Sequence, residues 1–491
     1  MNILFRNIFV SFVFISISSC ALAQIPLDIN TTVGSKIYNI PENSWVKLNS
    51  TNFDSVWTPK DQQTLDGWNK PVSILTAWSS MAWDSKRGKL IFWGGGHANY
   101  SGNETYLWNS VSGKWERGSL PTDIVKIESG LYHAKGGIMT APIANHTYDN
   151  SEYLPISDRF ITFGGASFNT GGPFIYINKN GIKEQTGPYL WDPSKADMNK
   201  TGGIDGSQVK PSIYPGVMGG NMWENRNNIT IIKPLILQPN GTWWPNRWWG
   251  EGTSAYSYEN KDVDTIYISD IHELYKYTIV DISDPSKDIL KKVGEQGAVA
   301  SGQGAGAYDP LLNRFVRTFG RPSATMDSAS TFAYWDLNAT KPKKVLFRPI
   351  DVSGGFDIGN LENFGMDYDP KRNQYILWDG SDQVWAMTAP TVPSANGWVI
   401  QRIYSKSINL GTEAPTKSIA GFIQSGILGK WKYVPSYDVF LGVNNATGDI
   451  WAYKPINWNP LLKDSSDVIP PEVVITEPFE NSVLINEWRN F

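Results

Sequence analysis

The chain has 491 residues, and 43 Lys and Arg against 47 Asp and Glu give it a formal net charge of −4. Few single compact cores reach this length, unless the fold is built from repeats that each pack only on their neighbours. The balanced charge, without a basic run, gives no reason to expect a nucleic-acid partner. The 22 Trp, 22 Tyr and 20 Phe suit both packed sheet faces and sugar-stacking surfaces.

The first 23 residues predict a signal peptide. Arg6 gives a weakly positive start, an apolar stretch covers 8–17, and Ala21-Leu22-Ala23 fits a cleavage site. The stretch is too short for a membrane span. Cys20, the only cysteine, also resembles the modified residue of a bacterial lipoprotein box, which makes an outer-membrane lipoprotein the alternative. In both cases we expect export, to the periplasm or the extracellular space.

Residues 24–42 form an N-terminal segment, and residues 43–460 predict a β-propeller. Its pattern is clearest in residues 81–118, where four β-branched and aromatic runs are separated by turns of Gly, Asn and Ser. Four antiparallel strands in about 40 residues have the size of one propeller blade.

An aromatic residue in the first strand of each blade stands eight positions before an aliphatic one in the second strand, and this spacing recurs six times. The pairs are Trp83 and Ile91, Tyr153 and Ile161, Tyr258 and Ile266, Tyr308 and Val316, Tyr368 and Ile376, and Tyr433 and Leu441. We therefore predict an all-β, six-bladed propeller, with seven blades as the alternative because a long tryptophan-rich stretch separates the second and third copies. Trp223-Glu224 fits the fourth strand of blade two.

The last copy has no convincing fourth strand of its own. Ser44 to Leu48, around Trp45, looks like a fourth strand without neighbours. We expect this N-terminal strand to complete the last blade, which would remove an open sheet edge.

Residues 81–118 also resemble a kelch repeat. The resemblance is carried by the apolar run, by the glycines Gly94 to Gly96, by Tyr106-Leu107-Trp108 and by Trp115. It points to the bacterial secreted kelch-repeat, galactose-oxidase-like propellers. The chemistry of that oxidase family uses a copper-bound tyrosine cross-linked to a cysteine. A chain cleaved after Ala23 has no cysteine, so we expect no oxidase activity, no disulfide and no cofactor.

Residues 461–491 differ in composition from the rest. A Pro-Pro linker precedes a stretch that resembles the first strand of a bacterial immunoglobulin-like module, but too few residues follow to complete that domain. The segment is read either as a linker with the start of a truncated module or as an ordinary polar tail.

Strands in a blade alternate in direction, so the loops before the first strand and after the second emerge on the same face. At this mouth of the central channel we expect a binding site. The candidate ligand-binding residues in these loops and in a long connection are Trp78, His133, Asn169, Gln303, Glu362, Asn363 and Lys430.

Five further residues suit acid–base chemistry at the mouth: His97, Tyr100, His146, Tyr148 and Arg321. Imidazole and phenol groups can move a proton, and an arginine can neutralise a carboxylate. This is the equipment of a polysaccharide lyase acting on uronate-containing glycans. The alternative for each histidine is a structural hydrogen bond, and Arg321 could pair with an acid between blades. No ligand spacing predicts a metal site.

A polar loop at residues 242–249 holds the remaining candidates. Its exposed aromatic rings could stack on sugars beside a cation, or the tryptophans could pack an insertion against the ring. The candidates are Trp243, Trp244, Arg247 and Trp248.

Three functions from different classes follow. The first is an exported, monomeric propeller that recognises a poly- or oligosaccharide at the channel mouth. The second is a polysaccharide lyase, and the third is a protein-interaction scaffold. Export and the aromatic surplus favour carbohydrate over protein as the partner, and the fold alone does not decide between binding and catalysis.

Overall fold

The computed structural model describes residues 24–63, 70–97, 99–126, 131–168, 174–177, 183–197, 222–228, 236–237, 243–244, 251–270, 273–295, 302–319, 332–404, 413–417 and 426–463. The predicted signal peptide with Cys20, and the C-terminal stretch from residue 464 on, lie outside these ranges. Within them, no helix is both long and apolar enough to cross a membrane.

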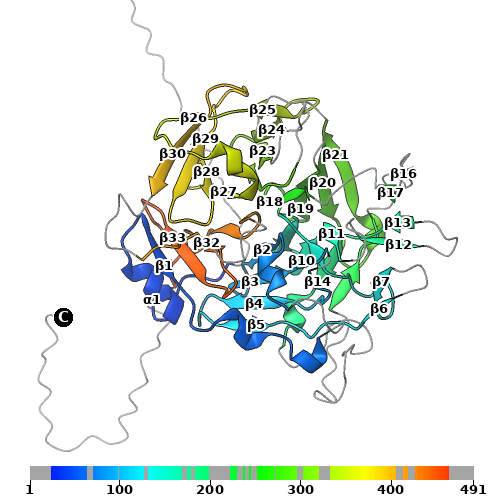
Figure 1. Ribbon diagram of the computed structural model, residues 1–491. Coiled ribbons are helices and arrows are strands. Elements are labelled where there is room, and N and C mark those ends of the chain that lie inside the picture. The colour runs from blue at the N-terminus through cyan, green and yellow to red at the C-terminus, as the bar shows by residue number, and fades with distance from the viewer. Residues whose placement is uncertain are drawn as a thin grey trace, which may run out of the picture.

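Six sheets, each built on four antiparallel strands, stand around a common centre (Figure 1). Blade 1 contains β2 (Ser80–Asp84), β3 (Lys89–Trp93), β4 (Tyr106–Asn109) and β5 (Trp115–Arg117). Blade 2 contains β9 (Ser151–Leu154), β10 (Arg159–Thr162), β14 (Tyr189–Trp191) and β15 (Trp223–Asn225). Blade 3 contains β18 (Thr253–Ser257), β19 (Asp264–Ser269), β20 (Leu274–Ile279) and β21 (Ile289–Gly294).

The second half of the ring follows the same plan. Blade 4 contains β22 (Gly306–Asp309), β23 (Arg314–Thr318), β24 (Phe332–Asp336) and β25 (Val345–Phe347). Blade 5 contains β27 (Gly365–Asp369), β28 (Gln374–Trp378), β29 (Val384–Thr388) and β30 (Val399–Tyr404), with β26 (Ile350–Asp351) added in parallel to β30. Blade 6 contains β31 (Trp431–Val434), β32 (Val439–Val443), β33 (Ile450–Lys454) and β1 (Ser44–Lys47).

The innermost strands pack on one another in the order β2, β9, β18, β22, β27 and β31, and β31 returns to β2. The ring therefore closes after six blades, as predicted, and Trp223-Glu224 lies in the fourth strand of blade 2. The described residues place no seventh blade in this ring.

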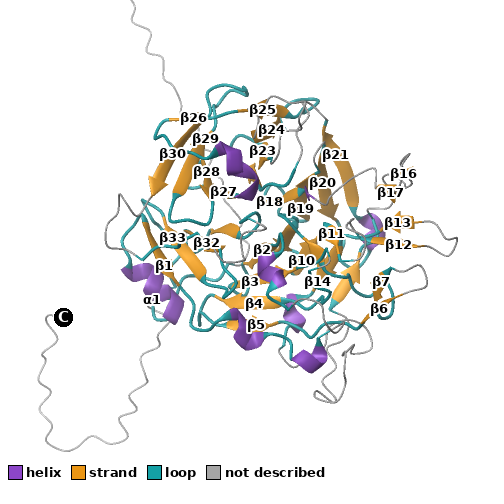
Figure 2. Cartoon of the chain, viewed as in Figure 1, coloured by secondary structure: helices purple, strands orange, loops and turns teal. Residues whose placement is uncertain are grey.

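Among the described residues, helices occur only as short pieces in the connections (Figure 2). They are α1 (Thr32–Asn39), α2 (Ser73–Thr76) and the 3₁₀ turns Phe53–Val56, Lys60–Gln62, Pro193–Lys195, Pro285–Lys287 and Ile358–Asn363. Four two-stranded ribbons complete the described elements: β6 (Ile124–Lys126) with β7 (Tyr132–Ala134), β8 (Asn145–His146) with β11 (Ala166–Ser167), β12 (Ile175–Ile177) with β13 (Lys183–Gln185), and β16 (Ile236–Leu237) with β17 (Trp243–Trp244).

The N-terminal strand closes the ring. In Figure 1 the blue β1 lies beside the orange β33, and the two pair antiparallel with Trp45 opposite Tyr453. Trp45 is 1% exposed, its ring centroid lies 5.4 Å from that of Trp378, and its indole N–H donates to Asp382 O at 3.1 Å. Blade 6 thus joins the two ends of the described chain, as the sequence predicted.

The repeated tyrosine of the first strand bonds to the turn that follows the strand. Its hydroxyl contacts an Asn or Asp in the turn to the second strand, in the pairs Tyr153–Asp158, Tyr308–Asn313, Tyr368–Asn373 and Tyr433–Asp438. These four turn residues have positive φ angles, a conformation that Asn and Asp tolerate better than most residues. In blade 1, Trp83 and Gly88 stand at the equivalent positions.

Blade 3 corrects one detail of the predicted repeat. The tyrosine that bonds to the turn there is Tyr256, whose hydroxyl donates to Asp264 at 2.9 Å, and Tyr256 pairs with Ile266. Tyr258, which the eight-residue spacing had selected, lies just beyond β18. The turn in this blade is three residues longer, so a fixed spacing counted from the second strand selects the wrong tyrosine.

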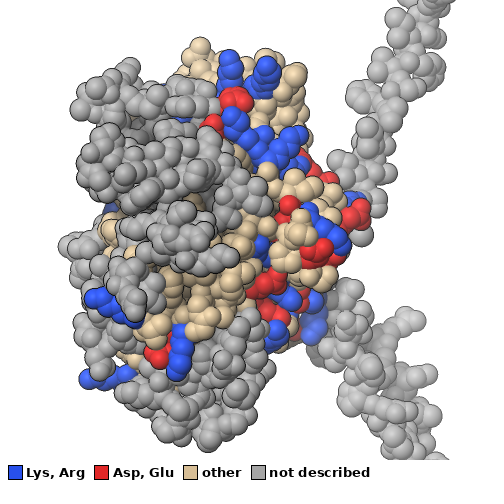
Figure 3. Space-filling model, turned by 90° about the vertical axis from the view of Figure 1, so that its right-hand side faces the viewer, with Lys and Arg blue, Asp and Glu red and all other residues tan. Residues whose placement is uncertain are grey.

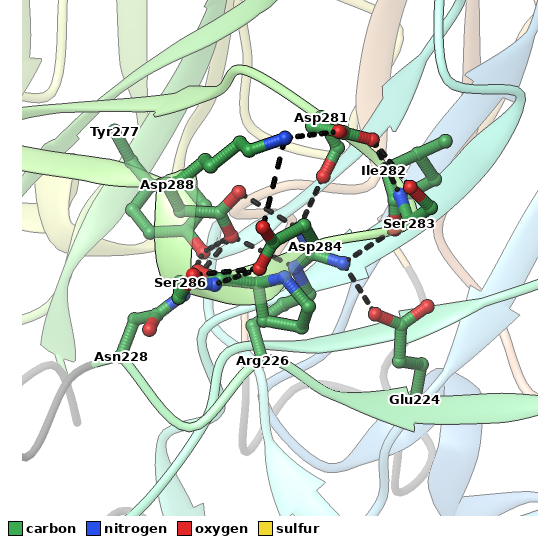
Figure 4. Close-up of polar contacts among 12 residues, drawn as sticks. Glu224, Arg226, Asn228, Tyr277, Asp281, Ile282, Ser283, Asp284, Ser286 and Asp288 are labelled. Atoms are coloured by element: carbon green, nitrogen blue, oxygen red, sulfur yellow. Dashed lines mark hydrogen bonds and ion pairs between the residues drawn. The ribbon is translucent and has the colours of Figure 1, made fainter.

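Ion pairs tie neighbouring blades together. Arg87 of blade 1 bonds Asp158 of blade 2 with both of its terminal nitrogens, and Arg372 of blade 5 bonds Asp438 of blade 6 in the same manner. Figure 4 shows a third joint, where the fully buried Arg226, next to β15, reaches Asp288 beside blade 3. On the face in Figure 3, described side chains of both signs lie intermixed rather than in a patch of one sign.

Candidate functional site at the mouth of the ring

The glycines before His97 allow its loop to lie against the strand that carries His146. Gly95 has a φ of +88°, which favours glycine, and a Cβ on Gly96 would stand 2.2 Å from the carbonyl oxygen of Ala144. Only a loop without side chains at this point can approach β8 so closely. The sequence GGGH therefore brings two histidines from different blades together.

The two imidazole rings meet at an aromatic cluster. The ring centroids of His97 and His146 are 5.2 Å apart in an edge-to-face arrangement. Trp78 lies 4.7 Å from His146 on another side, and Tyr148 lies 6.1 Å away. His97 is exposed and Trp78 half-buried, whereas His146 is only 1% exposed. A ligand at the mouth would therefore meet His97 and Trp78 first.

His146 is held neutral. Burial, together with the nearby charges of His97 and Lys430, lowers the pKa of His146 to about 3, although a hydrogen bond with the backbone of Gly96 raises it. Its Nε2 accepts a hydrogen bond of 2.9 Å from the Asn99 side chain, in the amide orientation that also lets Asn99 donate to the carbonyls of Gly96 and His97. His146 is thus a fixed, uncharged neighbour of the exposed His97.

The backbone around this cluster is strained. Eleven described residues other than glycine have a positive φ, and seven of these are Asn or Asp. The other four are the bulky Trp78 (46°), His97 (53°), Tyr148 (50°) and Leu428 (51°). Large side chains adopt this conformation at a cost of the order of 1–3 kcal/mol, and such residues gather at functional sites. All four stand in loops at this mouth.

The axial segment, residues 147–150, crosses the centre of the ring. Tyr148 N donates to Trp78 O of the blade 1 loop at 2.7 Å, and Tyr148 O accepts from Gly429 N beside blade 6 at 3.1 Å. Asp149 O accepts from Ser254 N of blade 3, and Asp149 Oδ2 accepts from Gly306 N of blade 4, both at 2.7 Å. A segment bonded to four other blades must lie on the axis, below the mouth.

Buried cations lie near this segment, among them Lys430 and Arg317. Lys430 is fully buried, its ammonium donates to Ser79 O at 3.3 Å, and burial lowers its pKa to about 7. Arg317 of β23 donates to the carbonyls of Asp270 and Glu251, and burial lowers its pKa to about 10. Lys430 was among the predicted residues, and its charge acts on His146. Arg317 was not predicted, because nothing in its strand distinguishes it before the blades are assembled.

The structure places other predicted residues elsewhere. The hydroxyl of Tyr100 donates to the buried Glu104 at 2.6 Å, and Tyr100 is 2% exposed within the hydrophobic cluster of blade 1. His133 lies in β7, half-buried, and pairs with Val125 of β6. Gln303 donates to Asn363 at 3.4 Å. Glu362 precedes Asn363 in the 3₁₀ turn Ile358–Asn363, so these three predicted residues lie on the loops of blades 4 and 5.

The remaining candidates cannot be placed. Asn169, Arg247, Trp248 and Arg321 lie outside the described residues. Trp243 and Trp244 are described only as the strand β17, opposite β16. Among the described residues, no group of three or more His, Cys, Asp or Glu is arranged to hold a metal ion.

Comparison with known proteins gives only remote similarities. No family model matches the chain, and no curated protein does. Among solved structures, an α-L-arabinanase of Penicillium chrysogenum in complex with arabinobiose is 10% identical, covers 83% of this chain and 97% of its own, and has a TM-score of 0.39.

An α-L-arabinofuranosidase of Fusarium graminearum in complex with arabinobiose is 12% identical with the same coverages and a TM-score of 0.38. The major allergen Mala s 1 of Malassezia sympodialis is 9% identical, covers 78% and 93% of the two chains, and has a TM-score of 0.34. Similarity at this level assigns no activity to the chain. The resemblance to kelch repeats remains a prediction.

Proposed function

We propose that the mouth of the ring binds a carbohydrate. The observation that carries the proposal is the half-buried Trp78 and the exposed His97, which both contact the buried His146 and are both held in strained backbone conformations. An indole face stacks on the apolar side of a sugar ring, and an imidazole exchanges hydrogen bonds with its hydroxyl groups. We infer that the chain is exported and acts as a monomer on poly- or oligosaccharides.

Binding is tested with a panel of neutral and acidic polysaccharides, by affinity electrophoresis and calorimetry. The substitutions His97→Ala and Trp78→Ala are each expected to weaken binding of any retained glycan about tenfold or more, about 1.4 kcal/mol. His133→Ala removes an imidazole from β7, outside the mouth cluster, and is expected to leave the affinity unchanged. Equal affinities of wild type and both mouth variants would refute the proposal, and so would a panel without any retained glycan. Recovery of a protein partner instead would favour a scaffold.

A lyase is the second candidate, favoured by the two imidazoles at 5.2 Å and by Tyr148. In such a reaction His97 takes the C5 proton of a uronate, the C4–O bond breaks, a C4=C5 double bond forms, and Tyr148 gives its proton to the leaving oxygen. Burial and the charge of Glu251 raise the pKa of Tyr148, so its phenol stays protonated until that step. Arg321 is the proposed partner of the uronate carboxylate.

The lyase candidate predicts new ultraviolet absorbance from unsaturated uronates when the protein acts on acidic polysaccharides. His97→Ala should abolish this signal, and Tyr148→Phe should lower its rate by a factor on the order of 10² or more. A retained acidic glycan that is never cleaved would leave binding as the function of the mouth.

A further inference from the structure

A cavity lies on the ring axis, on the side of the axial segment opposite the mouth. It has a volume of about 130 Å³, and its lining includes Trp83, Tyr153, Tyr256, Tyr308, Tyr368 and Tyr433. Each blade contributes one of these aromatic residues from its innermost strand, and the turns next to them add Pro155, Pro310, Pro370 and Pro435. The cavity therefore belongs to the face of the ring opposite the mouth.

Carboxylates exceed cations in the lining. Glu152 and Asp367 are the lining acids, and Lys432 is the lining cation. Lys432 is shared, because its ammonium lies 3.4 Å from Glu152 Oε1 and 3.4 Å from Oδ1 of Asp149, the carboxylate of the axial segment. Asp367 accepts hydrogen bonds from the backbone amides of Tyr368 and Tyr433, at 2.8 Å each. Neither of those bonds brings a positive charge.

Burial makes the ionised form of these carboxylates costly. It raises the pKa of Asp367 to about 6, and Glu152 adds to the effect although Lys432 opposes it. Burial raises the pKa of Asp149 to about 7, again against the effect of Lys432. A further positive charge placed here would be stabilised by both lining carboxylates, in surroundings that screen charge poorly.

Tyr258 is a partly exposed residue of the cavity wall. It lines the cavity and is 56% exposed, so solvent reaches this part of the wall. Tyr258 lines this cavity together with Asp367 and Glu152. Its centroid is 4.8 Å from that of Tyr256, so two aromatic rings stand next to the acids.

We propose that this axial cavity binds a small organic cation, an ammonium group whose charge faces Glu152 and Asp367 and whose carbon atoms contact the tyrosine rings. Aromatic faces attract such cations, most strongly where water is excluded. At about 30 Å³ for each water, the cavity has room for about four waters, which is near the size of a trimethylammonium group. The site is separate from the proposed carbohydrate site, because the axial segment lies between them.

Two probes of one shape test the charge requirement on the unaltered protein. Choline carries a trimethylammonium group, and 3,3-dimethylbutan-1-ol is its neutral analogue. Calorimetry and ligand-observed NMR are expected to show binding of choline at least about tenfold tighter than binding of the alcohol. Equal binding of the two, or no binding of choline, would overturn the proposal whatever the variants do.

A matched pair of variants locates the site. Glu152→Gln keeps the size and the hydrogen-bond acceptor of the side chain but removes its charge, and it is expected to weaken choline binding about tenfold. Glu116→Gln makes the same change in β5, where Glu116 pairs with Lys89 outside the cavity, and should leave the affinity unchanged. Choline binding that is equal in both variants would place the cation elsewhere. Glycan binding at the mouth is an independent measurement, so the two proposals fail separately.

Discussion

His146 makes the stability of this protein sensitive to acid. Its folded pKa of about 3 is below the ordinary value near 6.5, so the folded state binds fewer protons than the unfolded state between these pH values. The stability that neutral His146 contributes is present above pH 6.5 and is lost as the pH falls toward 3. Between pH 6.5 and 5 this loss amounts to about 2 kcal/mol.

The substitution His146→Gln removes this acid sensitivity while retaining a polar side chain. We expect the free energy of unfolding of the variant to fall about 2 kcal/mol less than that of the wild type between pH 6.5 and 5. Guanidinium denaturation at the two pH values measures the difference. Parallel slopes for wild type and variant would show that His146 is charged in the folded state.

Asp367 has the opposite effect on the dependence of stability on pH. Its folded pKa of about 6 is above the ordinary value near 3.9, so the folded state holds the proton more tightly, and stability decreases as the pH rises between these values. Asp367→Asn should therefore remove a decrease on the order of 2 kcal/mol between pH 4 and 6, measured by the same denaturation. Asp262→Asn, at an exposed turn position, is the control and should leave the slope unchanged.

At the scale of the element, β1 contributes more than its four residues suggest. It supplies the last strand of blade 6, and Trp45 packs between Trp378 of blade 5 and Trp431 of blade 6. Trp45→Ala removes this contact and leaves the carbonyl of Asp382 without its indole donor. We expect a loss of about 3–5 kcal/mol in the free energy of unfolding.

Chemical denaturation measures that loss, and limited proteolysis should detect an exposed edge of β33. Tyr38→Ala in α1 is the matched aromatic control, because Tyr38 is 46% exposed, and it should cost about 1 kcal/mol or less. Equal losses in the two variants would mean that β1 does not close the ring.

The blades could be predicted from the sequence because their aromatic positions repeat, and the closing strand because Trp45 lay in a strand pattern without neighbours. The register of blade 3 could not be predicted, since the longer turn before Asp264 shifts the tyrosine. The proximity of His97 and His146 could be predicted because the direction of the strands puts their two loops on the same face of the ring. Asn99, Asp149 and Arg317 escaped prediction because their roles come from contacts between blades, which no local spacing encodes.

At the scale of the whole molecule, Asp149 links the blades at their centre. Its carboxylate accepts from Gly306 N and faces Lys432, while its carbonyl accepts from Ser254 N. Asp149→Ala leaves the buried Lys432 with one carboxylate fewer and Gly306 N without a partner. We expect a loss of about 3–5 kcal/mol in stability.

Thermal and chemical unfolding measure this loss, and Asp262→Ala at the exposed turn should change stability by less than about 0.5 kcal/mol. A stable Asp149→Ala protein would show that the axial segment is not needed to hold the ring together.

Because residues 147–150 cross the ring, the mouth and the axial cavity lie on opposite sides of one segment. A substitution in the mouth or in the axial cavity is therefore expected to leave ligand binding at the other site unchanged. Among the described residues, Asp149 links the two sites, because it follows the strained Tyr148 in the chain and its carboxylate faces Lys432.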